Sequence, residues 1–194
     1  MADTSQRTTP TRVIDGIEAP APGDWAIDPG HAEVAFVGRH FMLTKVRGRF
    51  RGISGAVHVA EDPDDTTVEV AIDMASVDSG DDTRDDHLRS ADLFDVANHP
   101  MATFRGTARD WTGTSGKLAG DLTIKGITHP VVLDVDYLGY ATDPWGGQRA
   151  VFSASGNLLR EDWGVGWNMV LDTGGLLVSK EIRLELEIET LHQA

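Results

Sequence analysis

The feature that most constrains this chain is a repeated two-residue alternation of apolar and polar side chains. From residue 182 to residue 189, every even position is isoleucine or leucine and every odd position is arginine or glutamate. Successive side chains of a β-strand point to opposite faces, whereas a helix would spread these apolar residues around its circumference. The alternation therefore predicts a β-strand with one buried and one solvated face.

The same alternation recurs along most of the chain. It is clear over residues 68–74, 102–109, 118–125 and 133–137, and weaker over residues 32–39, 47–51, 54–60 and 150–159. Twenty-one glycines and eight prolines are spread through the chain, as a protein of many turns requires. The sequence thus predicts an all-β fold of eight or more strands, mostly antiparallel.

Two segments do not follow this rhythm. Around residues 83–95 the alternation stops, and Thr83 is suited to N-cap a short helix with Asp86 at its third position. Residues 1–24 contain few large apolar side chains, which predicts a disordered, mobile N-terminal arm. A single domain is expected over residues 25–191.

Strands with one solvated face fit either a two-sheet sandwich or a closed barrel. Several residues on the predicted inward faces are small, namely Ala102, Gly106, Ala108, Gly120, Ala150, Ala154 and Gly156. Small residues let two sheets pack closely, but in a barrel of roughly eight strands they leave an apolar hollow for a ligand. Periodicity alone leaves both architectures open.

Composition excludes several classes of function. Seventeen Lys and Arg against 31 Asp and Glu give a net charge of −14, which argues against nucleic acid and anionic membranes as partners. The absence of cysteine removes disulfides, thiolate nucleophiles and cysteine-based metal centres. The sequence shows neither a membrane-spanning apolar run nor the apolar core of a signal peptide, so we expect a cytoplasmic protein without stable membrane insertion.

No catalytic or metal-binding motif stands out. The densest cluster of candidate metal ligands is Asp81, Asp82, Asp85, Asp86 and His87. Its spacing matches neither a calcium loop nor a zinc site, and negative charge at the start of a helix explains it. The chain also has no Gly-x-Ser-x-Gly elbow and no phosphate-binding glycine loop, so we expect no metal and no cofactor.

Short motifs between Trp25 and Glu189 stand in a distinctive order. They are Trp25–Asp28 with His31, Phe36 and His40; Val46–Phe50; Arg84–Asp95; Pro100 with Phe104; Gly120–Gly126 with Pro130; and Arg160–Gly164. In this order they resemble the YceI-like family of bacterial polyisoprenoid-binding or lipid-binding proteins. The resemblance implies an extended antiparallel, lipocalin-like β-barrel of about eight to ten strands, with a short helix near residues 83–94.

The resemblance further implies an apolar tunnel that binds a long isoprenoid or acyl chain, and it does not imply catalysis. Candidates for the tunnel lining are Phe36, His40, Phe50, Leu88, Leu93, Phe94, Phe104, Leu122, Ile124, Phe152, Trp163 and Trp167. Arg84, Asp85 and His87 are candidates for anchoring the helix by charge-assisted hydrogen bonds. The helix segment would then act as a lid or a plug.

Three functions stay open at this point. The leading hypothesis is a carrier or store for a long-chain isoprenoid, isoprenoid quinone or fatty-acid derivative. An enzyme acting on such a lipid, with His87 or His40 handling a proton, is the second. The third is a ligand-free stress-response protein with a solid core. A homodimer is also left open.

Overall fold

The computed structural model describes residues 10–14, 16–170 and 176–193. Its strands are β1 (Thr11–Ile14), β2 (Ile17–Pro20), β3 (Gly23–His40), β4 (Thr44–Phe50), β5 (Ile53–Val59), β6 (Thr67–Asp73), β7 (Val77–Asp78), β8 (Met101–Thr112), β9 (Ser115–Ile124), β10 (Ile127–Thr142), β11 (Gln148–Leu159) and β12 (Glu181–His192). The α-helix is α1 (Asp82–Arg89), and short 3-10 turns span Pro63–Asp65, Met74–Ser76 and Arg160–Trp163. The predicted all-β fold is confirmed.

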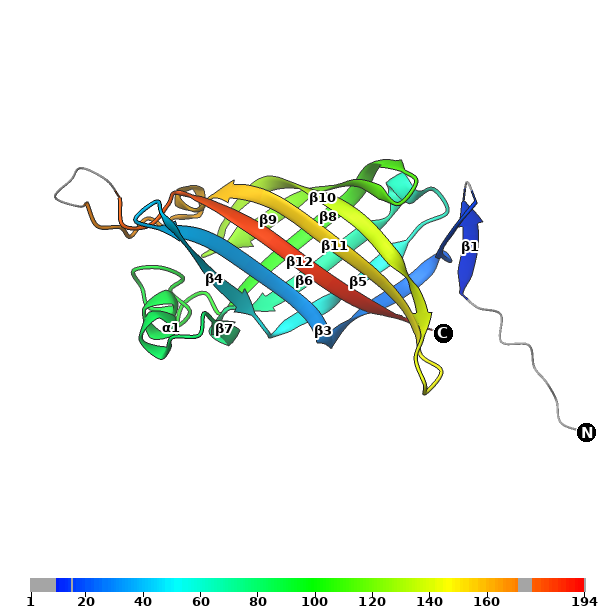
Figure 1. The fold of residues 1–194 in the computed structure, drawn as a ribbon, viewed down its shortest axis with the longest axis horizontal. Helices are drawn as coiled ribbons and strands as arrows, with labels where there is room; N and C mark the ends of the chain where they lie inside the picture. The colour runs from blue at the N-terminus through cyan, green and yellow to red at the C-terminus, as the bar shows by residue number, and fades with distance from the viewer. Residues whose placement is uncertain (1–9, 15, 171–175, 194) are drawn as a thin grey trace, which may run out of the picture.

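A closed barrel forms the body of the molecule (Figure 1). The sheet has ten strands in the order β12-β11-β10-β9-β8-β6-β5-β3-β4-β7, and a further pairing of β12 with β3 closes a ring of eight. All of these pairings are antiparallel. Of the two architectures that periodicity left open, the barrel is therefore the one observed.

Strand β3 takes part in both ends of the barrel. Its first residues, 23–26, pair with β5, and residues 34–40 pair with β4. Between them the register with β12 shifts, so that Ala32 lies opposite Ile188 and Ile27 opposite Thr190. Beyond this register shift, β4 pairs with β3 and the short β7 pairs with β4, so these two strands extend the wall at the end beside α1.

The alternation read from the sequence decides which side chains enter the barrel. On β8, Ala102 and Phe104 are buried while Thr103 and Arg105 are exposed. The apolar residues of β9 and β12 likewise point inward, where they pack against those of β3 and β10. A continuous apolar interior follows from this register.

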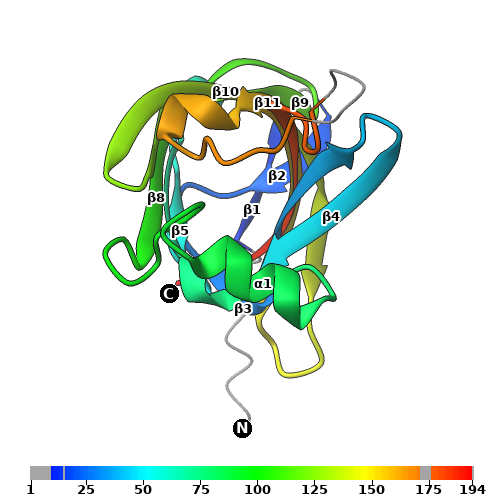
Figure 2. The same ribbon diagram turned by 90° about the vertical axis from the view of Figure 1, so that its left-hand side faces the viewer.

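Helix α1 lies across one end of the barrel (Figure 2). Its N-cap is Asp81, whose carboxylate accepts a hydrogen bond of 2.9 Å from the Arg84 amide. The prediction that Thr83 caps the helix is therefore wrong. Asp81, two residues earlier, is the residue that accepts a hydrogen bond from a free amide of the first turn. No helix among the described residues has the length and apolar character needed to span a bilayer.

At the other end of the barrel, β1 and β2 form a separate hairpin (Figure 1). Arg12 fixes it by donating hydrogen bonds of 2.7 Å to the carbonyl oxygens of Ala60 and Glu61. This hairpin lies within the stretch predicted as a mobile arm, and for residues 11–14 and 17–20 the structure departs from that prediction. The β1–β2 pairing and the bonds from Arg12 hold a segment whose apolar content gave no such signal.

Candidate functional site

The interior of the barrel contains two apolar cavities. Cavity 1, of about 350 Å³, lies at the end that carries α1. Cavity 2, of about 190 Å³, lies toward the β1–β2 hairpin. Both are bounded by the same wall residues, Val34, Ile72, Leu122 and Leu184. The two cavities therefore adjoin inside the barrel, at the level of these four side chains.

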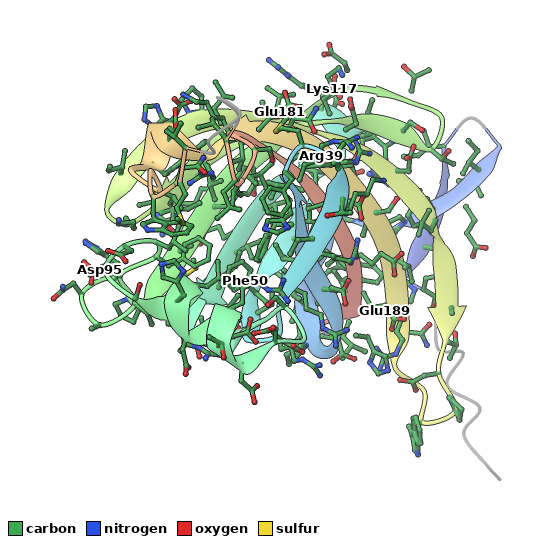
Figure 3. The ribbon with its side chains drawn as sticks, turned by 60° about the vertical axis from the view of Figure 1, so that its left-hand side comes forward. Arg39, Phe50, Asp95, Lys117, Glu181 and Glu189 are labelled. Atoms are coloured by element: carbon green, nitrogen blue, oxygen red, sulfur yellow. The ribbon has the colours of Figure 1, made fainter. Side chains whose placement is uncertain are left out.

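Aromatic side chains form much of the wall of cavity 1. The rings of Phe36, Phe50 and Phe94 contact one another with centroid distances of 5.5–6.3 Å, which joins β3 and β4 to the segment after α1. Figure 3 shows Phe50 among the side chains gathered at this end. Trp163 is buried, and its indole N–H donates a 2.9 Å hydrogen bond to the Leu122 carbonyl. This part of the wall is thus built from apolar rings in contact with one another.

Every residue predicted to line a tunnel lies on the wall of one of these cavities. Cavity 1 is lined by Phe36, His40, Phe50, Leu88, Leu93, Phe94, Ile124, Trp163 and Trp167. Phe104 and Phe152 line cavity 2, and Leu122 lines both. The strand register brings these residues together from distant parts of the chain.

The small residues behave differently from one another. Ala102 lines cavity 1, and Ala108 and Ala154 line cavity 2. At Gly106, by contrast, an added Cβ would lie 2.7 Å from the Phe104 ring and 2.9 Å from the Ala119 carbonyl oxygen. The expectation that inward glycines create the hollow is wrong for Gly106, because a neighbouring ring already fills the space.

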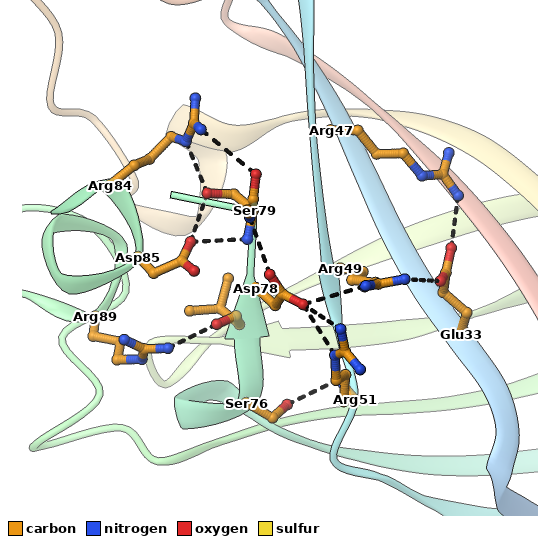
Figure 4. A network of polar contacts seen from close by, with 12 residues as sticks. Glu33, Arg47, Arg49, Arg51, Ser76, Asp78, Ser79, Arg84, Asp85 and Arg89 are labelled. Atoms are coloured by element: carbon orange, nitrogen blue, oxygen red, sulfur yellow. Dashed lines mark hydrogen bonds and ion pairs between the residues drawn. The ribbon is translucent and has the colours of Figure 1, made fainter. Parts of the chain in front are cut away.

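Polar contacts attach α1 to the barrel (Figure 4). The carboxylate of Asp85, which is buried, accepts hydrogen bonds from the Ser79 amide at 2.9 Å and the Ser79 hydroxyl at 2.5 Å. Arg84 donates to the same hydroxyl oxygen at 2.8 Å. His87 places its Nε2 atom 3.4 Å from a carboxylate oxygen of Asp92, and its ring stacks edge-on against Trp167 at a centroid distance of 4.5 Å on the wall of cavity 1. Arg84 and Asp85 thus make the predicted type of bond, and His87 both lies close to a carboxylate and lines the cavity.

Further contacts at this end have no signal in the sequence. Arg89 donates hydrogen bonds to the carbonyl oxygens of Ala75 at 3.0 Å and Val77 at 2.7 Å. Asp78 accepts hydrogen bonds from Arg51 and Arg49, and the bond from Arg51 is the main cause of a lowered pKa of that carboxyl group (Figure 4). These bonds join α1 to residues 75–77 and join Asp78 of β7 to the end of β4.

Arg160 is a buried cation on the wall of cavity 1. Its guanidinium donates to the carbonyl oxygens of Ser179 at 3.0 Å, Val165 at 2.6 Å and Trp167 at 2.9 Å. Burial lowers the pKa of this side chain, and its Nη2 atom has no partner among the described residues. Sequence reasoning missed Arg160 as a site residue, because its partners are backbone carbonyls of the following loop, and backbone carbonyls leave no pattern of residue types in the sequence.

Cavity 2 also contains an unpaired polar group. Tyr137 is buried beside Phe152, with ring centroids 5.4 Å apart. Its hydroxyl has no partner in the described part of the chain, and burial raises the pKa of this phenol to about 12. Arg12, Ile14 and Ile17 of the hairpin lie on the outer wall of the same cavity. The hairpin thus covers the far end of the interior.

The described residues contain one group whose ligand atoms converge as a metal site requires. Asp28, His31 and Glu189 place these atoms within 4.8 Å of one another. Arg149 already occupies the space between them, with hydrogen bonds of 2.5 Å to Asp28 and 3.1 Å to Glu189. The bond from Arg149 is the main reason that the pKa of Asp28 falls to about 2. An arginine paired to carboxylates explains this cluster.

Comparison with known proteins gives a consistent result. The family model for the YceI-like domain matches residues 25–190, a range that excludes the β1–β2 hairpin. A UPF0312 protein of Pseudomonas paraeruginosa is 36% identical over 173 residues, which cover 88% of this chain and 87% of that protein. Protein YceI of Escherichia coli O6:H1 is similar to the same extent, at 36% identity over 173 residues with the same coverage.

Solved structures with this fold are also known. BcnA of Burkholderia cenocepacia superposes with a TM-score of 0.71 at 25% identity, covering 84% of this chain and 98% of that one. A polyisoprenoid binding domain from Saccharophagus degradans superposes with a TM-score of 0.63 at 16% identity, covering 87% of this chain and 98% of that one. This second likeness shows the shared barrel fold.

Proposed function

Since the chain belongs to the family of YceI-like domains, we propose that it binds one long apolar lipid inside its barrel. The ligand classes that fit are a polyisoprenoid, an isoprenoid quinone or a fatty-acid derivative. The protein would transport, store or sequester this lipid, without a cofactor. The domain from Saccharophagus degradans, described as polyisoprenoid-binding, supports this choice of ligand class.

The observation that carries the proposal is the pair of apolar cavities meeting at Val34, Ile72, Leu122 and Leu184. A globular core is normally packed to the density of an organic crystal, so apolar cavities of about 350 and 190 Å³ are a departure from ordinary packing. Each methylene buried there contributes about 0.8 kcal/mol, so a long chain gains affinity along its whole length. A solid-core, ligand-free protein does not account for this space.

The unpaired donors suggest how a polar end of the ligand would be held. Arg160, whose Nη2 has no partner among the described residues, is one of the residues that line cavity 1, and Tyr137, whose hydroxyl has none, lines cavity 2. A buried donor without an acceptor is costly, and a ligand carbonyl, amide or hydroxyl oxygen would remove that cost at either end. Isoprenoid quinones and fatty-acid derivatives carry such an acceptor at one end of a long chain.

Binding accounts for the walls of the interior better than catalysis does. Ser79 is the hydroxyl residue on the described wall of cavity 1, and its oxygen already bonds to Asp85 and Arg84. His40 and His87 also reach this wall, but the imidazole ring of neither has a hydroxyl group as a hydrogen-bond partner among the described contacts, since Thr44 and Ser90 bond to their backbone carbonyls. No arrangement of nucleophile and base is therefore formed there.

Mass spectrometry of an organic extract tests the proposal. We expect freshly purified protein to release one apolar long-chain lipid per chain, and delipidated protein to take up added polyisoprenoid or fatty amide. An empty extract together with no uptake would contradict lipid binding. Turnover of the extracted lipid by the protein would instead support the enzyme alternative.

A further inference from the structure

The turn between β3 and β4 exposes three consecutive large apolar side chains. Phe41 is 47% exposed, Met42 is 53% exposed and Leu43 is 79% exposed. Phe41 and Met42 have φ angles of 52° and 60°, a left-handed conformation that bulky residues rarely adopt. Figure 1 shows this turn projecting from the end of the barrel that carries α1. Strain that holds apolar residues in solvent indicates a functional constraint on the turn.

A second loop adds to the same surface. Met169 is 55% exposed and Val170 is 76% exposed. Backbone hydrogen bonds of 2.9 Å join Phe41 N–H to the Leu177 carbonyl and Leu177 N–H to the Met169 carbonyl. These bonds fix the two loops side by side. We call the group Phe41, Met42, Leu43, Met169 and Val170 the apolar rim.

Two cations flank the apolar turn without a carboxylate partner. Arg39 and Lys45 lie directly opposite each other in the β3–β4 register, and both are exposed. Neither side chain makes an ion pair among the described residues, although the chain has 31 acidic residues against 17 basic ones. Like charges placed directly across two strands are destabilising. The pair therefore suits an anionic group supplied from outside the chain.

The apolar rim adjoins cavity 1. Arg39 and His40, immediately before the turn, line this cavity, and so do Trp167, Leu177 and Val178 from the second loop. His40 and Val178 are also joined by a β-bridge. A surface that touched the rim would therefore lie next to the wall of the lipid cavity.

We propose that the apolar rim docks on a phospholipid bilayer. Phe41, Met42 and Leu43 enter the interfacial layer, while Arg39 and Lys45 contact lipid phosphate groups, an arrangement typical of peripheral membrane anchors. Docking of this kind is reversible and requires no spanning segment. This docking surface goes beyond the proposed function. It rests on that function in one respect, namely that docking would bring cavity 1 close to the lipid.

A second copy of the chain fits the rim less well than a bilayer does. Dimers of one chain are most often two-fold symmetric, and a two-fold contact on the rim would bring the rim of each copy against the other. Arg39 and Lys45 of both copies would then meet with no carboxylate from the described rim between them. Phosphate groups of lipids supply the missing negative charge, even though the net charge of −14 weakens long-range attraction to a membrane.

Site-specific fluorescence can test this docking, because the chain has no cysteine of its own. We would label Leu43→Cys with a polarity-sensitive dye and add vesicles of phosphatidylcholine with phosphatidylglycerol. The matched control is Trp145→Cys, since Trp145 is 88% exposed in the turn between β10 and β11, at the opposite end of the barrel. A blue shift at position 43 alone is expected. Equal shifts at both positions, or none at position 43, would overturn the proposal.

Substitutions separate docking from lipid binding. Leu43→Ser should weaken vesicle partitioning by at least about tenfold, because burial of one leucine is worth more than that factor. Leu138→Ser, on the outer face of β10 with 59% exposure, should leave it unchanged. An organic extract of either variant should still contain the bound lipid. If neither variant contains lipid, the proposed function fails, and the vesicle assay still decides on docking. Sedimentation that shows a Leu43-dependent dimer without vesicles would favour a second copy and refute bilayer docking.

Reversal of the charge at Lys45 should raise the stability of the protein and weaken its binding to vesicles. Lys45→Glu removes the repulsion across the strands and creates a pair with Arg39. We expect a higher melting temperature together with weaker partitioning onto the same vesicles. A purely structural role for Lys45 would move only the first quantity, and unchanged partitioning would contradict the docking of these cations on lipid phosphates.

Discussion

Replacement of Val34 by phenylalanine tests whether the two cavities act as one tunnel. Val34 is 6% exposed on β3 and forms part of the wall of both cavities. A phenyl ring at this position would narrow their junction, so that a bound chain could fill cavity 1 but not reach cavity 2. The fold has room for the ring because both neighbouring spaces are hollow.

The expected effect follows from the length of chain excluded. If cavity 2, of about 190 Å³, holds only three methylenes of the ligand, their loss costs about 2.4 kcal/mol, or roughly fiftyfold in Kd. Overpacking in a filled core would instead cost about 1–3 kcal/mol of stability, which is visible as a lowered melting temperature. Val132→Phe makes the same change on the outer face of β10, where the side chain is 43% exposed, and serves as the matched control.

The assay is a titration with a homologous series of fatty amides or prenols of increasing length. In the wild-type protein, affinity should rise with each added unit until both cavities are full. In Val34→Phe the rise should stop at a shorter chain, with little change for short ligands. The same length dependence in both proteins would refute the view that the cavities form one binding tunnel.

Three further results are expected. The pKa of Asp28 is lowered by Arg149, so this pair stabilises the fold above the ordinary pKa of 3.8 and its contribution is lost as the pH falls toward 2. Arg149→Met should therefore unfold more easily at neutral pH and show a flatter loss of stability between pH 4 and pH 2, and an acid profile matching the wild type would contradict this. Arg89→Met should lower the free energy of unfolding by about 1–2 kcal/mol and speed lipid exchange, because the carbonyls of Ala75 and Val77 lose their donor; an unchanged exchange rate would show that α1 does not control access. Dialysis against a chelator should leave the melting temperature and lipid content unchanged, whereas a drop in either would reveal a metal site.

Local patterns in the sequence were enough to predict most of the strands of the fold. Alternation identified the strands and their inward faces, and it placed Phe36, Phe104 and Leu122 on the side where the cavities lie. This works because strand parity is a local property, fixed by successive side chains pointing to opposite faces. Closure of the barrel came from the family resemblance, since alternation alone also fits a sandwich.

Features that depend on how particular side chains pack and bond in the folded chain were not predictable in this way. Arg160 is buried because carbonyl groups of residues 165, 167 and 179 surround its guanidinium, and no spacing in the sequence announces that. Gly106 is filled by the ring of Phe104 from its own strand, which parity does not show. In the β1–β2 hairpin, Arg12 reaches the carbonyls at positions 60 and 61, almost fifty residues away. Each case depends on where side chains and carbonyl groups lie in the folded chain, which apolar and polar alternation does not record.

Native mass spectrometry of the freshly purified protein tests the central claim most directly. The chain has a mass of 21.0 kDa, and occupation of the barrel by one lipid predicts a second species heavier by the mass of a single long-chain molecule. Gentle activation should release this molecule and leave the bare chain. A protein of 21.0 kDa alone, which also fails to gain mass when incubated with polyisoprenoid or fatty amide, would contradict the claim.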